Sequence, residues 1–200
     1  MAFTDFKSAD QVQKAYRIKY TESDFIKLAS LSPPKTFVLD YEFSKNNFDI
    51  FSSEASRCEA VIYPILREVC KQFVSQYSLW SHKSISADST LTGTPDYIIS
   101  RRSELGKNVL EYPIVVIAEA KQNDFVQGWG QCLAEMVAAQ KLNNEETLAV
   151  YGIVTDAELW QFGKLQGKHF TKNYSRATID NLDRVFGSVF NVVELASKGL

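Results

Sequence analysis

Three stretches of the chain carry hydrophobic residues at the spacing of an amphipathic helix, three or four positions apart. They are residues 52–76, 125–142 and 180–196. Pro64 lies inside the first stretch and is expected to kink or interrupt it, because proline lacks a backbone N–H. Each stretch is long enough to cover one face of a sheet, so we expect helices at these three places.

Runs of apolar and β-branched residues predict four strands. The runs are residues 93–99, 115–121, 147–155 and 159–162. The third run is almost entirely apolar, which is typical of a central strand buried on both faces. Because strands and helices alternate along the chain, we expect an α/β fold with a central four- to five-stranded mixed β-sheet and helices on both of its faces.

The N-terminal fifth has a less regular pattern. Residues 9–28 have the composition of a helix, which Pro33 and Pro34 would end, and residues 36–39 are expected to form a short edge strand. We expect one domain over residues 1–200, made of an N-terminal extension (1–48), a core (50–165) and the C-terminal helix (180–196).

The composition supports a folded chain. It has 200 residues, of which 45% are hydrophobic, enough for a full core. The first residues lack a basic segment followed by an apolar run, and no stretch has the length of a membrane span, so we expect a cytoplasmic protein without a membrane partner.

Cysteine and histidine do not form a pattern typical of a metal site. Cys58, Cys70 and Cys132 are widely separated and are expected to be buried thiols. His82 and His169 have no ligand-type neighbours at zinc spacing, and His82 is expected on the surface.

Carboxylates stand at the ends of two predicted strands. Glu119 and Lys121 are two residues apart, so both side chains point to one face while Ala120 points away. If the two strands pair, the side chain of Asp96 lies in the same pocket as those of Glu119 and Lys121. Carboxylate oxygens are ligands for Mg²⁺ or Mn²⁺, and a lysine beside them can bind a phosphate oxygen or orient water. The alternative is that these are ordinary strand-end residues with a solvated lysine.

The pair Pro95-Asp96 followed by Glu119-Ala120-Lys121 resembles the signature of the PD-(D/E)XK superfamily, the restriction-endonuclease-like nucleases, and in particular its short bacterial members. The order of elements over residues 50–165 is similar as well. The resemblance implies a restriction-endonuclease-like core and Mg²⁺-dependent hydrolysis of DNA phosphodiester bonds that leaves a 5′-phosphate.

The same resemblance implies roles for individual residues. Asp96 and Glu119 would hold Mg²⁺, or Mn²⁺ in its place, and the backbone carbonyl of Ala120 would complete the ligand set. Lys121 would position the attacking water and offset charge on the phosphate. Asp96, Glu119 and Lys121 are therefore the expected catalytic residues.

Two further polar residues are candidates for the site. Glu59 lies inside the apolar stripe of residues 52–76, and helices at this place in the resembled family often carry an acidic residue to the metal. Glu59 is thus expected to be an additional metal ligand or water-holding group, with Glu54 as the second choice. A glutamate at the rim of the stripe that reaches solvent or pairs with Arg67 remains the alternative.

In the resembled family, a polar residue on the helix after the Glu-x-Lys strand commonly lines the site. Gln131 is the matching catalytic candidate, Gln127 is its alternative, and a plain surface amide is the other interpretation. Some members carry Gln-x-x-x-Tyr here, whereas this chain has Glu135 in place of the tyrosine. The exonuclease-like branch is therefore not indicated.

The charge of the chain bears on its partners. The formal net charge is −2, whereas tight nucleic-acid binders usually carry a basic excess. Two local groups of basic residues are either substrate-binding rims or solvated loops: Arg101, Arg102 and Lys107, and Lys164, Lys168 and Lys172.

We expect Arg101 and Arg102 to contact the substrate. The expected partner is a nucleic acid, more specifically DNA. For the assembly, a homodimer and a larger complex both stay open. RNA as substrate, and the choice between endonuclease and exonuclease, stay open. The alternative function is a non-catalytic module, or a subunit of a larger complex, that keeps the nuclease fold and binds nucleic acid or protein.

Overall fold

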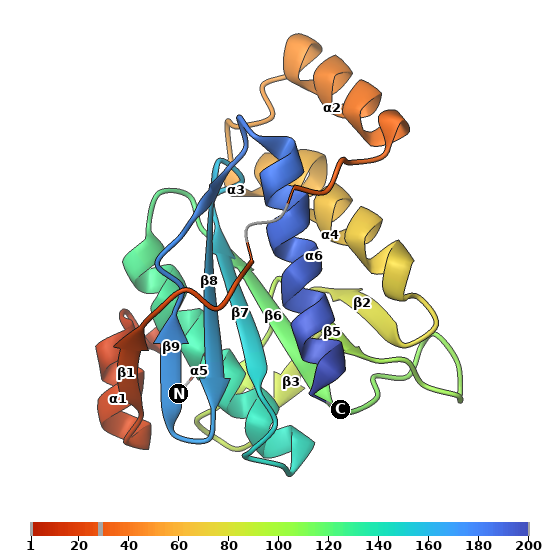
Figure 1. The fold of residues 1–200 in the computed structure, drawn as a ribbon. Coiled ribbons are helices and arrows are strands. Elements are labelled where there is room, and N and C mark those ends of the chain that lie inside the picture. The colour runs from red at the N-terminus through yellow and green to blue at the C-terminus, as the bar shows by residue number, and fades with distance from the viewer. Residues whose placement is uncertain (1, 28–29, 200) are drawn as a thin grey trace.

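A computed structural model describes residues 2–27 and 30–199 of the protein. A mixed β-sheet runs through it (Figure 1). The strand order is β1-β9-β8-β7-β6-β5-β2, with β10 paired to β8. The strands are β1 (Lys19–Glu22), β2 (Tyr77–Ser81), β5 (Tyr97–Arg101), β6 (Ile114–Ala120), β7 (Val150–Thr155), β8 (Leu159–Gln166), β9 (His169–Lys172) and β10 (Ala177–Thr178). Two pairs, β1–β9 and β6–β7, are parallel, and the others are antiparallel. A separate short pair joins β3 (Ile85–Ser86) to β4 (Thr92–Gly93).

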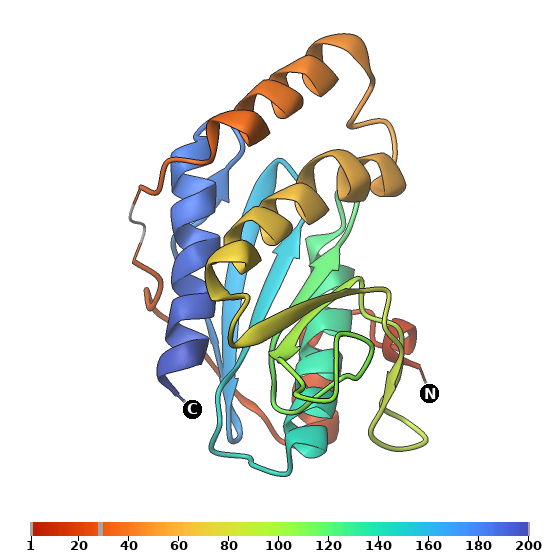
Figure 2. The same ribbon diagram turned by 90° about the vertical axis from the view of Figure 1, so that its right-hand side faces the viewer.

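Helices cover both faces of this sheet (Figures 1 and 2). One face packs against α4 (Tyr63–Cys70) and α6 (Leu182–Lys198), and the other against α5 (Phe125–Asn143), which in turn contacts η1 (Phe3–Asp5) and α1 (Ala9–Tyr16). Each face has its own buried apolar cluster. Among the helices of the described residues, none is long and apolar enough to cross a membrane.

The predicted α/β class, with a mixed sheet between helices, is confirmed. The predicted helices and strands after residue 50 are present with shifted bounds: the strand expected over residues 93–99 is β5, which begins at Tyr97. The predicted number of strands is wrong, because the sheet has eight. The additional strands, β1, β2, β9 and β10, have two to five residues each, too few for a clear alternation of apolar and polar positions.

The N-terminal region also differs from its prediction. Residues 9–28 do not form one helix, because α1 ends at Tyr16, Arg17 adopts a left-handed conformation (φ 55°), and β1 follows. Leu28, at the end of that predicted helix, lies outside the described residues. Residues 36–39 are not a strand but belong to α2 (Lys35–Asn47), which follows Pro34. Of the apolar residues that suggested a strand, Phe37 anchors this helix together with Tyr41, one turn later, whereas Leu39 is exposed.

The helix predicted over residues 52–76 is present but changes its winding. It consists of α3 (Glu54–Arg57), the π-helical turn η2 (Cys58–Ile62), α4 and the 3₁₀ turn η3 (Lys71–Phe73). The N–H of Tyr63 reaches the carbonyl of Cys58, five residues back. The next residue, Pro64, has no N–H to offer to an α-helical bond. A π turn holds one extra residue, so it rotates α3 relative to the apolar stripe of α4.

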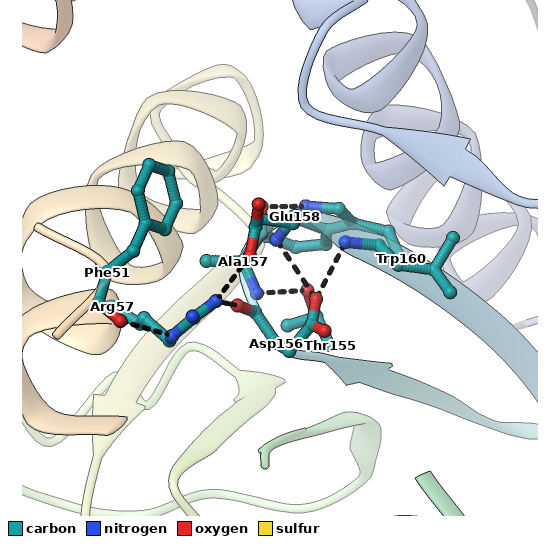
Figure 3. A network of polar contacts seen from close by, with 8 residues as sticks. Phe51, Arg57, Thr155, Asp156, Ala157, Glu158 and Trp160 are labelled. Atoms are coloured by element: carbon teal, nitrogen blue, oxygen red, sulfur yellow. Dashed lines mark hydrogen bonds and ion pairs between the residues drawn. The ribbon is translucent and has the colours of Figure 1, made fainter. Parts of the chain in front are cut away.

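Arg57 attaches α3 to the turn between β7 and β8 (Figure 3). Its guanidinium is buried and donates to the carbonyl of Asp156 at 2.6 Å, to the carboxylate of Glu158 at 3.0 Å and to the carbonyl of Phe51 at 3.1 Å. The turn itself is closed by Asp156, whose carboxylate accepts two backbone N–H groups. Because β7 lies beside β6, this contact fixes α3 over the end of both strands.

Candidate functional site

The ends of β5 and β6 bring the predicted acidic residues together. Tyr97 pairs with Ala118 in the antiparallel ladder, so Asp96, directly before β5, stands opposite Glu119. The carboxylate oxygen Oδ2 of Asp96 accepts the backbone N–H of Ala120 at 2.8 Å. Asp96, Glu119 and Ala120 therefore meet at one point, as the sequence led us to expect.

Glu119 and Lys121 form a close ion pair at this point. The Nζ of Lys121 lies 3.0 Å from Oε1 of Glu119, as the two-residue period of a strand requires. Glu119 is only 3% exposed, and its second oxygen, Oε2, has no hydrogen-bond partner among the described residues. A buried carboxylate oxygen without a partner is costly unless it binds a proton or a cation.

Close approach of α5 to β7 and to the end of β6 depends on Gly128. A Cβ atom at this position would lie 2.7 Å from Cγ1 of Val154 and 3.2 Å from Cγ of Lys121. The absence of a side chain therefore lets the first turns of α5 lie directly on the aliphatic part of Lys121, which holds the ammonium group in place.

Glu135 is a site residue that the sequence did not reveal as one. It lies on α5, is 1% exposed, and its Oε2 has no hydrogen-bond partner within the described part of the chain. The helix α5 lies against β6, and the charges of Glu119 and Asp96 help to raise the pKa of Glu135, so Glu135 belongs to the same group of carboxylates. Two features of the sequence could have indicated that Glu135 is buried. It stands inside a run of small and apolar residues, and it lies seven positions after Gly128 and thus on the same helix face.

Burial and mutual repulsion change the pKa values of these groups. Burial first, and then the charge of Asp96, raise the pKa of Glu119 to about 8, against the opposite effect of Lys121. Burial, Glu119 and Asp96 raise the pKa of Glu135 well above its usual range. Burial acts to lower the pKa of Lys121, but the carboxylates of Glu119 and Glu54 outweigh it and raise this pKa. Lys121 is therefore a stable cation among three acidic groups.

A cleft of about 520 Å³ opens beside Asp96. It is lined by α3, η2 and the N-terminal end of α4 on one side and by the facing ends of β2 and β5 on the other. His82 is exposed there, as predicted, but it also contacts the site. Its backbone N–H donates to the backbone carbonyl of Asp96 at 2.8 Å, and its ring nitrogen Nε2 lies 3.6 Å from Oδ1 of Asp96. No pattern in the sequence indicated that His82 lies beside Asp96.

Glu59 does not occupy the predicted position in the apolar stripe. It is exposed and lines the cleft, because the π turn rotates it away from the core. Glu54, the second choice, is closer to the site: its Oε1 lies 4.0 Å from the Nζ of Lys121, and its Oε2 accepts the N–H of Gln122 at 3.3 Å. The buried carboxylate on this helix is Glu68, which pairs with Arg67 and Lys71.

Gln131 is buried on α5, between Gly128 and Glu135 on the helix face that lies against the sheet. The interpretation of Gln131 as a surface amide is therefore wrong. Gln127 is half-buried in the first turn, where its N–H is bonded to the carboxylate of Asp124.

The two groups of basic residues that were candidates for substrate binding do not lie together at the site. Arg101 ends β5 and Asp96 precedes its start, so about 16 Å of strand separates them. Arg102 lies beyond Arg101 and donates to the carbonyl of Val74. Lys164 and Lys172 diverge, because the Nζ of Lys164 lies over the ring of Phe25 and that of Lys172 lies over the ring of Trp129, on the opposite face.

The donor set suits a hard divalent cation. Asp96, Glu119 and the carbonyl of Ala120 offer oxygen atoms only, which Mg²⁺ and Mn²⁺ prefer, and Oε2 of Glu119 is buried without a partner. No three Asp, Glu, His or Cys side chains of the described residues are gathered closely enough to hold a metal by themselves. The expected set has two carboxylates and one carbonyl, so substrate phosphate and water would supply the remaining oxygen ligands.

A scan of the chain against protein-family models gives no match, and a search of curated proteins finds no similar sequence.

Proposed function

We propose that the protein is a nuclease that hydrolyses DNA phosphodiester bonds with the help of Mg²⁺ or Mn²⁺ held by Asp96 and Glu119. One observation carries the proposal: these two carboxylates lie at the ends of paired strands, with the ammonium group of Lys121 3.0 Å from Glu119. The proposed fold is a restriction-endonuclease-like core. The antiparallel β5–β6 pair, the helix α5 that returns over the sheet, and the parallel β6–β7 pair support it.

Five residues of the site have a proposed role. Oδ1 of Asp96, Oε2 of Glu119 and the carbonyl of Ala120 would hold the metal, since Oδ2 of Asp96 is used by the N–H of Ala120. When bound, the metal neutralises phosphate charge and lowers the pKa of a water ligand. Lys121 would bind a non-bridging phosphate oxygen and orient the attacking water, and Glu54 would hold the amine in place.

Cleavage of DNA tests this proposal. Supercoiled plasmid, linear duplex and single-stranded DNA are incubated with Mn²⁺ and wild-type protein, Lys121→Met or Lys198→Met. Methionine keeps the aliphatic contact with Gly128 but removes the charge. Lys198 is the matched control, because it pairs with a glutamate at 3.0 Å on the exposed side of α6. We expect Lys121→Met to lose at least about 100-fold in rate and Lys198→Met to cleave as the wild type does.

Equal rates in all three proteins would indicate a contaminating nuclease and contradict the proposal. Absence of cleavage in all three would favour the alternative function, a module that keeps the fold without turnover. Calorimetric titration with Mn²⁺ then separates a metal-binding module from a protein without a metal site.

A further inference from the structure

A second hollow lies on the other side of the first turns of α5. It is a cavity of about 290 Å³ between α1, α5, β1 and β9. Four aromatic rings line it, those of Tyr20, Phe125, Trp129 and Phe170. The proposed nuclease site uses none of these residues.

The floor of this cavity is fixed. Trp129 and Phe170 are buried, and their ring centroids lie 5.4 Å apart. The indole N–H of Trp129 donates to Oε1 of Gln161 at 2.8 Å. Gly163 lies directly beneath, where a Cβ would come within 2.8 Å of the two rings. A rigid aromatic floor lowers the entropy lost when a flat ligand binds.

The wall of the cavity reaches solvent. Tyr20 is 43% exposed on the edge strand β1, and Val126 is 67% exposed in the first turn of α5. Tyr20 is also in contact with the floor, since its ring lies 6.0 Å from that of Phe170. An aromatic side chain that is half-exposed beside a hollow offers one face for stacking.

The cavity also carries positive charge. The Nζ of Lys172 lies 5.5 Å from the ring centroid of Trp129, and Lys172 is half-buried in the cavity wall. Burial and then the charge of Arg176 lower the pKa of Lys172, against the opposite effect of Glu22. On the opposite wall, the side-chain oxygen of Gln13 accepts no hydrogen bond within the described residues, whereas its amide nitrogen donates to the carbonyl of Ile18.

We propose that this cavity binds one unpaired base of a nucleic-acid strand, with the base stacked between Tyr20 and Phe125 and the adjoining phosphate beside Lys172. The inference rests on the proposed function for the class of ligand. A base supplies a flat π-system for the aromatic wall and hydrogen-bonding edges for Gln13, and its phosphate supplies an anion for Lys172.

The position of the cavity agrees with this role. In α5, Gly128 lies on Lys121 while the next residue, Trp129, forms the cavity floor. Consecutive residues of an α-helix point about 100° apart, so the two sites lie on adjacent sides of the first turns of α5. Since a paired base would first have to leave its duplex, the cavity favours single-stranded or branched substrates.

Binding without metal tests the inference apart from catalysis. The affinity of a fluorescently labelled oligothymidylate is measured by anisotropy in EDTA, for the wild type, Tyr20→Ala and Lys172→Ala. Two matched controls are Tyr174→Ala, an exposed tyrosine outside the cavity, and Lys164→Ala, the lysine on the other face of the same two strands. We expect each cavity variant to weaken binding about tenfold and each control to stay within about twofold of the wild type.

An abasic oligonucleotide of the same length and charge separates stacking from charge. We expect the wild type to bind it about tenfold more weakly than oligothymidylate, and Tyr20→Ala to bind both alike. Equal affinity of the wild type for the two strands, equal effects of cavity and control variants, or no binding at low salt would each overturn the inference.

Cleavage assays on the cavity variants, run beside the binding assay, keep the two proposals distinguishable. If cleavage is found but the cavity variants bind and cleave normally, the nuclease proposal stands and the base-binding cavity is rejected. If cavity-dependent binding is found without cleavage, the nuclease proposal fails alone.

Discussion

The carboxylate of Asp96 accepts the backbone N–H of Ala120 at 2.8 Å, one step beyond the ladder pair of Tyr97 and Ala118. A side chain thus joins β5 and β6 where their regular pairing stops. Asp96 consequently has two tasks, because one oxygen holds the strand end and the other remains for the site.

Substitution of Asp96 can separate these two tasks. Asp96→Asn keeps an oxygen that accepts the N–H of Ala120 but removes the charge, so we expect nearly unchanged stability with loss of Mn²⁺ binding and cleavage. Asp96→Ala removes both and should also lower the free energy of unfolding by about 1 kcal/mol. Urea unfolding and calorimetry measure the two effects. Full metal affinity in Asp96→Asn would contradict the assigned ligand.

Stability should depend on pH through Glu119 and Glu135. Their pKa values are raised in the folded protein, that of Glu119 to about 8, so the folded state keeps protons that the unfolded chain releases above its ordinary glutamate pKa. Raising the pH from about 5 to about 8 in EDTA should therefore lower the free energy of unfolding, by at most about 1.4 kcal/mol per proton and pH unit.

Glu135→Gln tests this expectation, because glutamine cannot ionise. We expect it to flatten the decline of stability with pH, whereas Glu146→Gln, at an exposed position beyond the end of α5, should leave the decline unchanged. Thermal unfolding across the pH range provides the measurement. Stability that is constant or rises between these pH values would show that the two carboxylates are not protonated in the folded state.

Glu54 and Glu59 should differ in their effect on cleavage, although both line the same cleft. Glu54 lies 4.0 Å from the amine of Lys121, so we expect Glu54→Gln to reduce the rate about 10- to 100-fold. Glu59 is exposed and is rotated away by the π turn, and Glu59→Gln should have little effect. A larger loss in Glu59→Gln would restore the role predicted from the sequence.

Removal of the guanidinium of Arg57 should loosen α3. Arg57→Met leaves the carbonyls of Phe51 and Asp156 without their donor, and we expect a loss of about 2–3 kcal/mol in unfolding free energy. Glu158→Gln should cost less than about 1 kcal/mol, because the Glu158 side chain is 54% exposed. Chemical denaturation of both variants checks the order. Similar losses would mean that the ion pair, rather than the carbonyl contacts, holds α3.

The part of the site that lies on strands could be predicted from the sequence. A two-residue period fixes the relative direction of Glu119 and Lys121 on any strand, and one pairing step brings Asp96 to them. Likewise, α5 and α6 follow from long apolar periods.

The part that depends on distant contacts could not be predicted. The edge strand β1 is exposed at all four positions and exists because it pairs with β9, about 150 residues away. Glu135 is surrounded by apolar residues in the sequence, and only the fold brings it to Glu119 and Asp96. Periodicity placed Glu59 in the core because it assumes a regular α-helix, which the turn at Cys58–Ile62 is not.

The extra residue in the π turn at Cys58–Ile62 sets the direction in which the side chains of α3 point relative to α4. An α-helix advances about 100° per residue, so deletion of one residue between Cys58 and Ile62 would turn everything before it by about that angle relative to α4. Arg57 would then point away from the β7–β8 turn and Glu54 away from Lys121, with no change in either side chain. At this place, the length of the chain matters as much as the identity of its residues.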